Sequence, residues 1–460
     1  MDNLNIYIKP FGNEAYQVKY FDVRMELEHC SLKQGETAAD LWNVVAGVPG
    51  CILSGDMRAE DENGILPLTM ELEPGFAPGF EKRVWKTGRA VDGTMTLTYR
   101  FYPRNLEDVD RGHPLFDVCN EPYGVTMSGV TCLAAVKDQR WQVHMEWDLS
   151  EMPENTKVVS IKGNDFVGTP EDYTFTLFAL GDVKTVSDES GKYAMHWLAE
   201  PLPDEARLSS VLPALIGGLC RFFKDEDIPY HVFFRKDPFD HSNSGTAFDN
   251  GFIFGYSDAM PVSVDASLNT LAHEITHNWP HMKNDGGEGN WFNEGTAEYY
   301  SMVIPYRCGL ISSEEMAAQL TKKGRNYYGS TCQHMTNEEV HQLTWSDRDA
   351  QRLPYGRGLF YLAETDARLR KKTGGEVCVD DLVLTLVEMR KSGTVPSVQD
   401  WEGQLARFFG EEEIVYFHQV MEGKNIDVNP DWFGGMFEAS MEPDGSVIWK
   451  EKEGLADVRF

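Results

Sequence analysis

Residues 271–279 read Leu-Ala-His-Glu-Ile-Thr-His-Asn-Trp, and residues 291–300 read Trp-Phe-Asn-Glu-Gly-Thr-Ala-Glu-Tyr-Tyr. The first stretch contains the pattern H-E-x-x-H. His273 and His277 are four residues apart, so on a helix both imidazoles project from one face towards a common metal ion. An apolar stripe along the same segment, followed by Pro280, predicts that helix. The two stretches together therefore predict a pair of helices that build a metal site.

H-E-x-x-H alone is a weak signal, because two buried histidines on an amphipathic helix would show the same pattern. Glu294, seventeen residues after His277, supplies the third protein ligand that a catalytic zinc needs, with a fourth position left for water. Glu274 lies beside the ligands and is placed to take a proton from the attacking water. Glu298 follows Glu294 by one helical turn and is expected to accept a hydrogen bond from the outward-facing ring nitrogen of His273 or His277. We therefore expect one Zn²⁺ ion, with cobalt and manganese left open as the native metal.

The spacing excludes one competing zinc arrangement. An H-E-x-x-H-x-x-G-x-x-H site would need glycine at position 280 and histidine at position 283, where this chain has Pro280 and Lys283. His281 is the nearest spare imidazole, but it follows the proline that ends the helix. We interpret His281 as a loop or pocket residue.

The two stretches resemble the gluzincin aminopeptidases, zinc enzymes that take two histidines from one helix and a glutamate from the next. The alanyl aminopeptidase and leukotriene hydrolase branch typically shows W-L-N-E-G-F-A-E-Y after a slightly longer spacer. The glycyl aminopeptidase branch, metallopeptidase family sixty-one, has an N-terminal β domain and a thermolysin-like catalytic domain. Residues 355–382 resemble that second branch in its Y-x-K-G, L-D-x-x-I-R, T-G-G and L-D-D elements, and the resemblance covers roughly residues 15–420.

The sequence departs from the glycyl aminopeptidase pattern at two places. The basic loop that usually follows the second histidine is replaced by Pro-His-Met-Lys-Asn-Asp-Gly-Gly. We also expect the chain to lack the C-terminal PDZ domain that is common in that family. The substrate preference of the family is therefore not carried over.

Two further sets of candidate residues come from the resemblance. Tyr355 matches the tyrosine that in both branches donates a hydrogen bond to the tetrahedral oxyanion, and a phenol, neutral at pH 7, suits that task. Residues 245–252 resemble the G-x-M-E-N segment of the alanyl branch, with Asp249 in place of the glutamate that holds the free α-amine. Gly245, Asp249 and Asn250 are therefore candidate substrate-binding residues. A Gly-Asp-Asn stretch is also typical of turns, and that alternative stays open.

Hydrophobic periodicity indicates the fold class. About the first 165 residues alternate with period two, in runs at 16–28, 65–72, 94–102, 124–133 and 141–147. Short strands separated by turn-rich stretches favour a sandwich-like β domain, and from about residue 203 a helical period takes over. We expect an α+β multidomain protein. Its N-terminal all-β sandwich-like domain spans 1–170, a thermolysin-like, mainly α-helical zinc peptidase domain spans 171–410, and an extension of uncertain structure spans 411–460.

Composition restricts the partners. The chain has 42 Lys and Arg against 73 Asp and Glu, a net charge of -31, which repels phosphate backbones and anionic lipid. We expect neither nucleic acid nor membrane as a partner, and no segment is apolar enough for a membrane span. The start lacks the pattern of a signal peptide, and eight scattered cysteines fit reduced thiols, so we expect a cytoplasmic protein. The oligomeric state stays open.

These observations predict a zinc metallopeptidase that acts on peptide substrates. The simplest form is an aminopeptidase that releases N-terminal residues from small peptides. Two alternatives stay open: a zinc endopeptidase with the same chemistry and no amine anchor, and a catalytically silent zinc-bearing binding or scaffold protein. The residue preferred at the cleavage site is not predicted.

Overall fold

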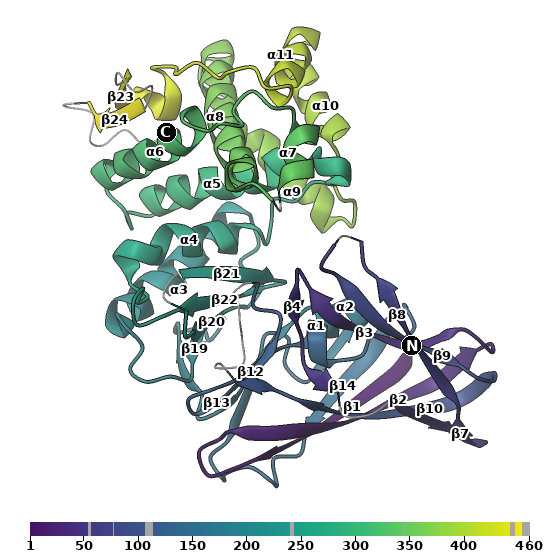
Figure 1. Ribbon diagram of the computed structural model, residues 1–460. Helices are drawn as coiled ribbons and strands as arrows, with labels where there is room; N and C mark the ends of the chain where they lie inside the picture. Colours follow the sequence, from purple (N-terminus) through teal and green to yellow (C-terminus); the bar gives the residue numbers. More distant parts are fainter. Residues whose placement is uncertain are drawn as a thin grey trace. The chain divides into compact units, whose positions relative to one another are not determined.

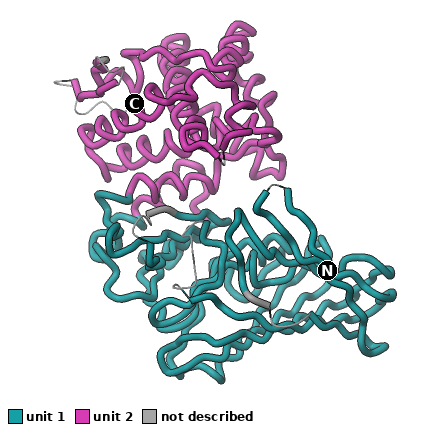
Figure 2. Tube along the Cα trace, viewed as in Figure 1, with its two compact units in different colours: residues 1–213, 228–267 teal, residues 214–227, 268–460 magenta. Residues whose placement is uncertain are grey.

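The computed structural model describes residues 1–53, 57–76, 78–105, 114–239, 243–344, 346–441 and 447–452. They form two compact units, one of residues 1–213 with 228–267 and the other of residues 214–227 with 268–460 (Figure 2). Strands dominate the first unit and helices the second (Figure 1), which confirms the α+β class with its β-rich N-terminal part. The predicted boundaries near residues 170 and 410 remain predictions, because compactness groups the sheet at residues 184–256 with the N-terminal strands.

Two sheets of the first unit share one hydrophobic core, as expected of a sandwich-like domain. The larger sheet has the order β16 (Asp165–Gly168), β14 (Trp141–Trp147), β1 (Asp2–Gly12), β2 (Val18–Leu32), β10 (Val91–Tyr102), β6 (Arg58–Asp61) and β7 (Gly64–Leu66), with β5 (Ile52–Leu53) also paired to β10. The smaller sheet has the order β4 (Val48–Pro49), β3 (Thr37–Val45), β9 (Glu81–Thr87) and β8 (Leu68–Pro74). Buried side chains from both sheets fill the core, Met25 and Leu97 from one and Leu41 and Trp85 from the other.

Strand β2 shows why period two predicts these elements. Its side chains at Phe21, Val23, Met25 and Leu27 are buried, and those between them are not. Near the start of the strand, Gly12 pairs with Val18 and Phe11 with Tyr20, so Lys19 is an extra residue that shifts the phase. The shift accounts for the irregular alternation in this part of the sequence.

A second pair of sheets completes the first unit. One has the order β11 (Arg104–Asn105), β12 (Val118–Glu121), β13 (Gly124–Ser128), β17 (Leu177–Gly181) and β15 (Lys157–Ser160), and the other β18 (Lys184–Ser187), β19 (Tyr193–Trp197), β20 (Tyr230–Lys236), β22 (Gly251–Tyr256) and β21 (Asn243–Phe248). Strands β19, β20 and β22 are parallel, and β21 is an antiparallel edge strand. The short helix α2 (Pro170–Thr174) precedes β17.

One strand expected from the sequence is wrong in its second half. The run at 124–133 forms β13 and then α1 (Gly129–Cys132). The Oγ of Ser128 accepts a hydrogen bond from the backbone N of Val130 and so caps the short helix. The polar residue Ser128 within an otherwise apolar run was the sequence signal for this helix. The two-residue periodicity of the run masked it.

Helices α3 (Glu205–Phe222) and α4 (Val264–Thr276) carry the chain between the units, and the rest of the second unit follows them. It contains α5 (Asn290–Arg307), α6 (Ser313–Tyr328), α7 (Asn337–Leu343), α8 (Arg348–Thr373), α9 (Val379–Lys391), α10 (Val398–Phe408), α11 (Glu411–Met421), two 3₁₀ turns (Asp285–Gly287 and Trp432–Gly435) and a hairpin of β23 (Phe437–Met441) and β24 (Val447–Glu451). A capping box of Ser312 and Glu315 starts α6. Within the residues that the structure describes, no helix is both long and apolar enough to cross a bilayer.

The pair α5 and α8 is held in close backbone contact by two glycines. A Cβ added to Gly295 would collide with Gly358, and one added to Gly358 would collide with the carbonyl oxygen of Trp291. Only glycine permits this approach. It brings the start of α5, which carries Glu294, alongside the part of α8 that carries Tyr355.

Candidate metal centre

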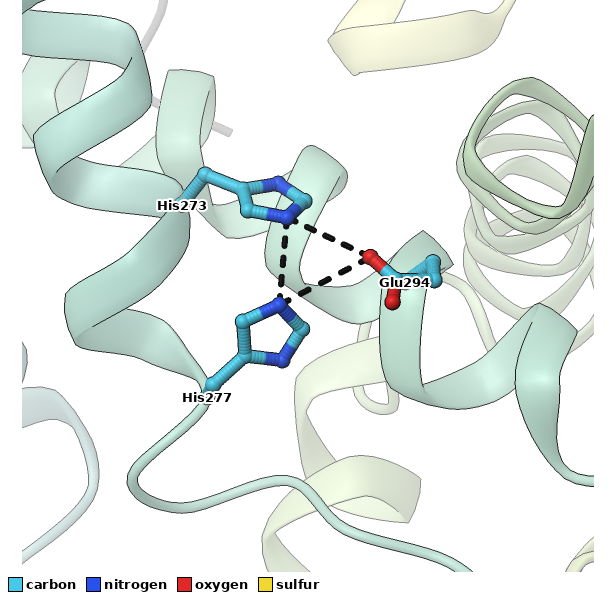
Figure 3. Close-up of side chains that lie close together, drawn as sticks. All are labelled: His273, His277 and Glu294. Carbon is cyan, nitrogen blue, oxygen red and sulfur yellow. Dashed lines mark hydrogen bonds and ion pairs between the residues drawn. The ribbon is translucent and has the colours of Figure 1, made fainter. Parts of the chain in front are cut away.

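His273 and His277 lie at the carboxyl end of α4. His273 is in its last turn, and His277 directly follows its last residue, where the backbone tightens to hydrogen bonds from Asn278 N to Ile275 O and from Trp279 N to Thr276 O. The two imidazoles therefore still face the same side, as the four-residue spacing predicts. Their Nε2 atoms lie 3.1 Å apart (Figure 3).

Glu294 approaches the two imidazoles from α5. Its Oε2 lies 3.3 Å from the Nε2 of His273 and 3.6 Å from the Nε2 of His277 (Figure 3). The three ligand atoms all fall within 4.8 Å of one another, and no other such group of histidine, cysteine and carboxylate side chains occurs in the described residues. The three residues expected as ligands are thus brought together.

The chemistry of this donor set fits a divalent cation. Burial lowers the pKa of His277 to about 4, so its imidazole is neutral and offers a lone pair. The Oε2 atom of Glu294 is buried and faces the two imidazole nitrogens, which would share a metal ion with it. Two imidazole nitrogens and one carboxylate oxygen are the ligands of a catalytic zinc site with an open fourth position. His273, His277 and Glu294 are therefore the residues that would hold the metal.

Glu274 follows the first histidine and lies within the same site. Burial raises its pKa to about 7, and the nearby charge of Glu294 acts in the same direction, whereas His273 opposes the shift. A carboxyl group with a pKa near neutrality can both accept and return a proton. The role of Glu274 as general base remains a proposal.

Tyr355 reaches the site from α8. Its ring is parallel to the ring of His273, with centroids 5.3 Å apart and planes inclined by 4°. Burial raises the pKa of the phenol well above its usual value, and the charges of Glu294 and Glu274 raise it further. The phenol is therefore neutral and lies beside the candidate ligands. Its role as the oxyanion donor remains a proposal.

Glu298 has a different partner from the one expected. Its Oε2 forms an ion pair with the Nζ of Lys323 on α6, and the same Nζ donates to the Oδ1 of Asn269 on α4 at 3.0 Å. Among the contacts of the described residues, none joins Glu298 to an imidazole. The expected hydrogen bond from His273 or His277 is thus replaced by a polar bridge between α4, α5 and α6.

Sequence reasoning missed two residues that support the site. Lys323 forms the bridge just described, and Arg390 donates from Nη1 to the carbonyl oxygens of Asn278 and Trp279, at 2.6 and 3.0 Å, directly after His277. A basic residue in the last turn of a helix usually stabilises that helix's own end. Since Arg390 instead caps the end of α4, more than a hundred residues away, no local pattern reveals it.

The candidate substrate-binding residues lie in the first unit. Gly245 is on the edge strand β21, and a Cβ there would collide with the ring of Phe252, so packing alone explains the glycine. Asp249 and Asn250 form the turn between β21 and β22, and Asn250 has a φ of 58°, which asparagine tolerates. The carboxylate of Asp249 lies 3.8 Å from the Nζ of Lys162. The role of these residues in binding substrate remains a proposal.

No protein-family model and no curated protein matches the chain. Among solved structures, an aminopeptidase N family protein from Idiomarina loihiensis matches 92% of this chain and 77% of its own, with a TM-score of 0.70 at 15% identity. Native yeast LTA4 hydrolase matches 94% of this chain and 69% of its own, with a TM-score of 0.54 at 12% identity. The same values hold for yeast LTA4 hydrolase in complex with Bestatin. At this identity the likeness shows the fold, a β-rich N-terminal part followed by a helical part.

Proposed function

We propose that this chain is a zinc metallopeptidase, and that it acts as an aminopeptidase on small peptides. The observation that carries the proposal is the convergence of two imidazole nitrogens and one carboxylate oxygen within 4.8 Å, beside Glu274 and Tyr355. The solved structures with this fold, an aminopeptidase N family protein and LTA4 hydrolase, support the same class of chemistry.

Each side chain of the site has a task in peptide hydrolysis. A zinc ion on His273, His277 and Glu294 would polarise the scissile carbonyl and acidify water. Glu274 takes the proton of the attacking water and returns it to the leaving amine. The phenol of Tyr355 donates a hydrogen bond to the oxyanion, a charge that exists only after the attack.

The exopeptidase form of the proposal rests on Asp249. A carboxylate at the end of the edge strand β21 would pair with the free α-amine of a peptide and fix cleavage after one residue. One observation favours the second candidate, a zinc endopeptidase, because Lys162 already lies 3.8 Å from that carboxylate and competes with an amine. Both candidates use the same zinc chemistry.

The choice between the two resembling branches belongs to the proposal as well. Residues 355–382 favour the glycyl aminopeptidase branch, whereas the two solved structures compared with this chain, an aminopeptidase N family protein and LTA4 hydrolase, favour the other branch. Both branches place the ligands, the base and the tyrosine on the same residues of this chain. The cytoplasm remains the proposed location on the grounds of the scattered cysteines.

A digest of a mixed peptide library, free and N-acetylated, with and without a chelator, tests the function. Release of single N-terminal residues from free peptides only, and only without chelator, is the expected result in mass spectrometry. Internal cuts in both pools would replace the aminopeptidase by the endopeptidase. A zinc-loaded protein that cuts nothing in either pool would favour the silent binding or scaffold protein.

A further inference from the structure

The chain between the two ligand helices has little regular structure of its own. Residues 278–293 separate His277 from Glu294, and before α5 begins their regular structure is the short 3₁₀ turn Asp285–Gly287. A loop of this kind is ordinarily among the parts of a protein that open most easily. A metal site, however, needs its ligands held to within about 0.5 Å. The backbone path alone is therefore a poor means of fixing Glu294 relative to His277.

Asn293, which directly precedes Glu294, supplies a second path. Its side chain is buried in the first turn of α5. The Oδ1 accepts a hydrogen bond from the backbone N of Met282 at 2.7 Å, and the Nδ2 donates to the carbonyl oxygen of Met282 at 3.1 Å. Met282 is itself fully buried. This pair of hydrogen bonds, the Asn293 clasp, thus satisfies both backbone polar groups of a residue that water does not reach.

The clasp shortens the connection between the ligands. Met282 follows His277 by five residues, so the path through the clasp crosses five residues and one side chain, where the backbone path crosses sixteen residues. Residues 283–292 form a closed loop outside the shorter path. The two limbs of this loop touch beside the clasp, because a Cβ added to Gly289 would lie 2.1 Å from the carbonyl oxygen of Lys283. The tip of the loop, residues 283–286, is exposed.

The residues that follow His277 are also fixed from the other side. Arg390 donates to the carbonyl oxygens directly after the histidine, and the backbone N of Lys283 donates to the carbonyl oxygen of Pro396 at 2.8 Å. Both anchors belong to α9 and the segment after it. The shorter path is thus held by this segment at one end and by the clasp at the other. A movement of Glu294 away from His277 would break the clasp.

Asparagine is well suited to this task. Its short side chain offers one donor and one acceptor at a fixed spacing, whereas an aspartate lacks the donor and a leucine lacks both. The first unit contains the same arrangement, in which Asn120 accepts from the backbone N of Val18 and donates to its carbonyl oxygen, each at 3.0 Å. The two clasps differ in one respect. The residue after Asn293 is a candidate metal ligand, and the residue after Asn120 is not.

We infer that Asn293 is a positioning residue of the metal centre, and that its hold on Met282 places Glu294 opposite His273 and His277 before a metal ion binds. The inference rests on the proposed function, because the metal belongs to that proposal. A preformed site binds its ion without the entropic cost of ordering a loop, so loss of the clasp weakens metal binding. The expected effect is therefore on metal affinity and on the arrangement of the ligands.

Zinc affinity in Asn293→Leu, measured by competition with a chelator, tests the inference. We expect the Kd for zinc to rise about 10- to 100-fold, the usual effect of losing a residue that orients a metal ligand. The visible absorption of the cobalt-loaded protein is expected to change as well, because it depends on the arrangement of ligands around the ion. Asn293→Ser, whose side chain is too short to reach Met282, is expected to give the same results should the leucine not fit the buried place.

Asn120→Leu is the matched control, because it removes the same pair of backbone hydrogen bonds in the first unit. Both leucine variants are expected to lower the Tm of the metal-free protein. The variants of Asn293 alone are expected to change the zinc affinity and the cobalt spectrum. Equal changes in Asn120→Leu would mean that any loss of stability weakens zinc binding, and would overturn the inference.

Hydrogen exchange of the metal-free protein tests whether the site is preformed. The peptide that contains Met282 is expected to exchange slowly in the wild type and faster in Asn293→Ser. Protection that appears only after zinc is added would overturn the inference, and so would wild-type zinc affinity with an unchanged cobalt spectrum in Asn293→Leu. Either result leaves the proposed function standing. A wild-type protein that binds no zinc would instead overturn the proposed function, and the inference with it.

Discussion

The phenol ring of Tyr355 lies parallel to the imidazole of His273, with ring centroids 5.3 Å apart. This contact joins α8 to α4, while Gly295 and Gly358 allow the backbones of α5 and α8 to touch. Three helices thus converge on one site, and α8 is distant in sequence from the other two. The position of the phenol relative to the candidate ligands follows from helix packing. Its hydroxyl is hydrogen-bonded to the carboxylate of Glu294, so a change to the hydroxyl removes one contact of a single ligand and leaves both imidazoles in place.

Replacement of Tyr355 by phenylalanine is therefore expected to separate catalysis from metal binding. Loss of one oxyanion donor lowers kcat by about 10²- to 10³-fold, because the stabilised charge exists only in the transition state. Metal content, measured by atomic absorption, stays at the wild-type level. Tyr361→Phe on the same helix, where the hydroxyl accepts from Trp401, is the control and keeps kcat. A Tyr355→Phe variant with near wild-type kcat would contradict the role.

Replacement of Glu274 by glutamine removes the general base and keeps the shape of the side chain. We expect the zinc content to match the wild type and peptide hydrolysis to fall to background, because glutamine cannot accept the proton of water. Glu288, an exposed glutamate in the loop before α5, gives the matched control Glu288→Gln. Substantial turnover by Glu274→Gln would assign the base to another residue.

Local patterns predicted single strands and the helix that carries His273. The alternation of apolar and polar residues predicted the bounds of β14, Trp141–Trp147, because successive side chains of a half-buried strand point to opposite faces of the sheet. The four-residue spacing of His273 and His277 likewise reports one face of a helix. Such signals are contained within a single element, so the sequence alone shows them.

Contacts between elements account for what could not be predicted. Glu298 occupies the expected position one turn after Glu294, yet Lys323, twenty-five residues later on another helix, takes its carboxylate. Nothing in the sequence around Lys323 marks it as a partner, since a lysine on an amphipathic helix usually faces solvent. Arg390 is a similar case. Both depend on how helices pack, and packing is not a local property.

The His–His–Glu assignment predicts how the protein responds to loss of metal. A ligand that binds only the folded state raises Tm, so a chelator is expected to lower Tm and added zinc to restore it. His277→Ala removes a ligand and abolishes this response. His281→Ala, four residues on in the exposed loop, keeps it. Differential scanning calorimetry of both variants gives the answer, and an unchanged zinc response in His277→Ala would remove that histidine from the ligand set.

The bridge between Glu298 and Lys323 predicts a strong coupling energy. Removal of one partner leaves a largely buried charge without its counter-ion, so Glu298→Gln and Lys323→Met are each expected to cost about 3–5 kcal/mol in the free energy of unfolding. The double variant costs less than the sum. The exposed pair of Arg207 and Asp265 is the comparison, with a coupling below about 1 kcal/mol. A Glu298→Gln variant that keeps its stability and loses zinc affinity about 10- to 100-fold would contradict this bridge. It would indicate instead that the carboxylate of Glu298 accepts a hydrogen bond from a ligand imidazole.

A buried histidine and a half-buried histidine of the first unit predict a loss of stability in mild acid. The Nε2 of His196 lies 3.0 Å from the Nδ1 of His231, and the Nδ1 of His196 lies 2.9 Å from the Oγ1 of Thr185. Burial lowers the pKa of His196 to about 3, with the charge of His231 acting in the same direction, and burial lowers the pKa of His231 to about 4. Both imidazoles therefore stay neutral in the folded protein.

The sign of the effect follows from proton binding. Below the unfolded pKa of about 6.5 the unfolded chain takes up protons and the folded chain does not, so stability falls as the pH falls towards 4. Between pH 7 and pH 5 the expected loss is about 2 kcal/mol for each imidazole. Urea unfolding of His231→Gln at both pH values is expected to show a smaller difference than the wild type, because one of the two groups no longer titrates. His29→Gln, which replaces an exposed histidine, keeps the wild-type difference. If the wild type and both variants lose the same free energy of unfolding between pH 7 and pH 5, protonation of His196 and His231 does not destabilise the folded protein, and the prediction is wrong.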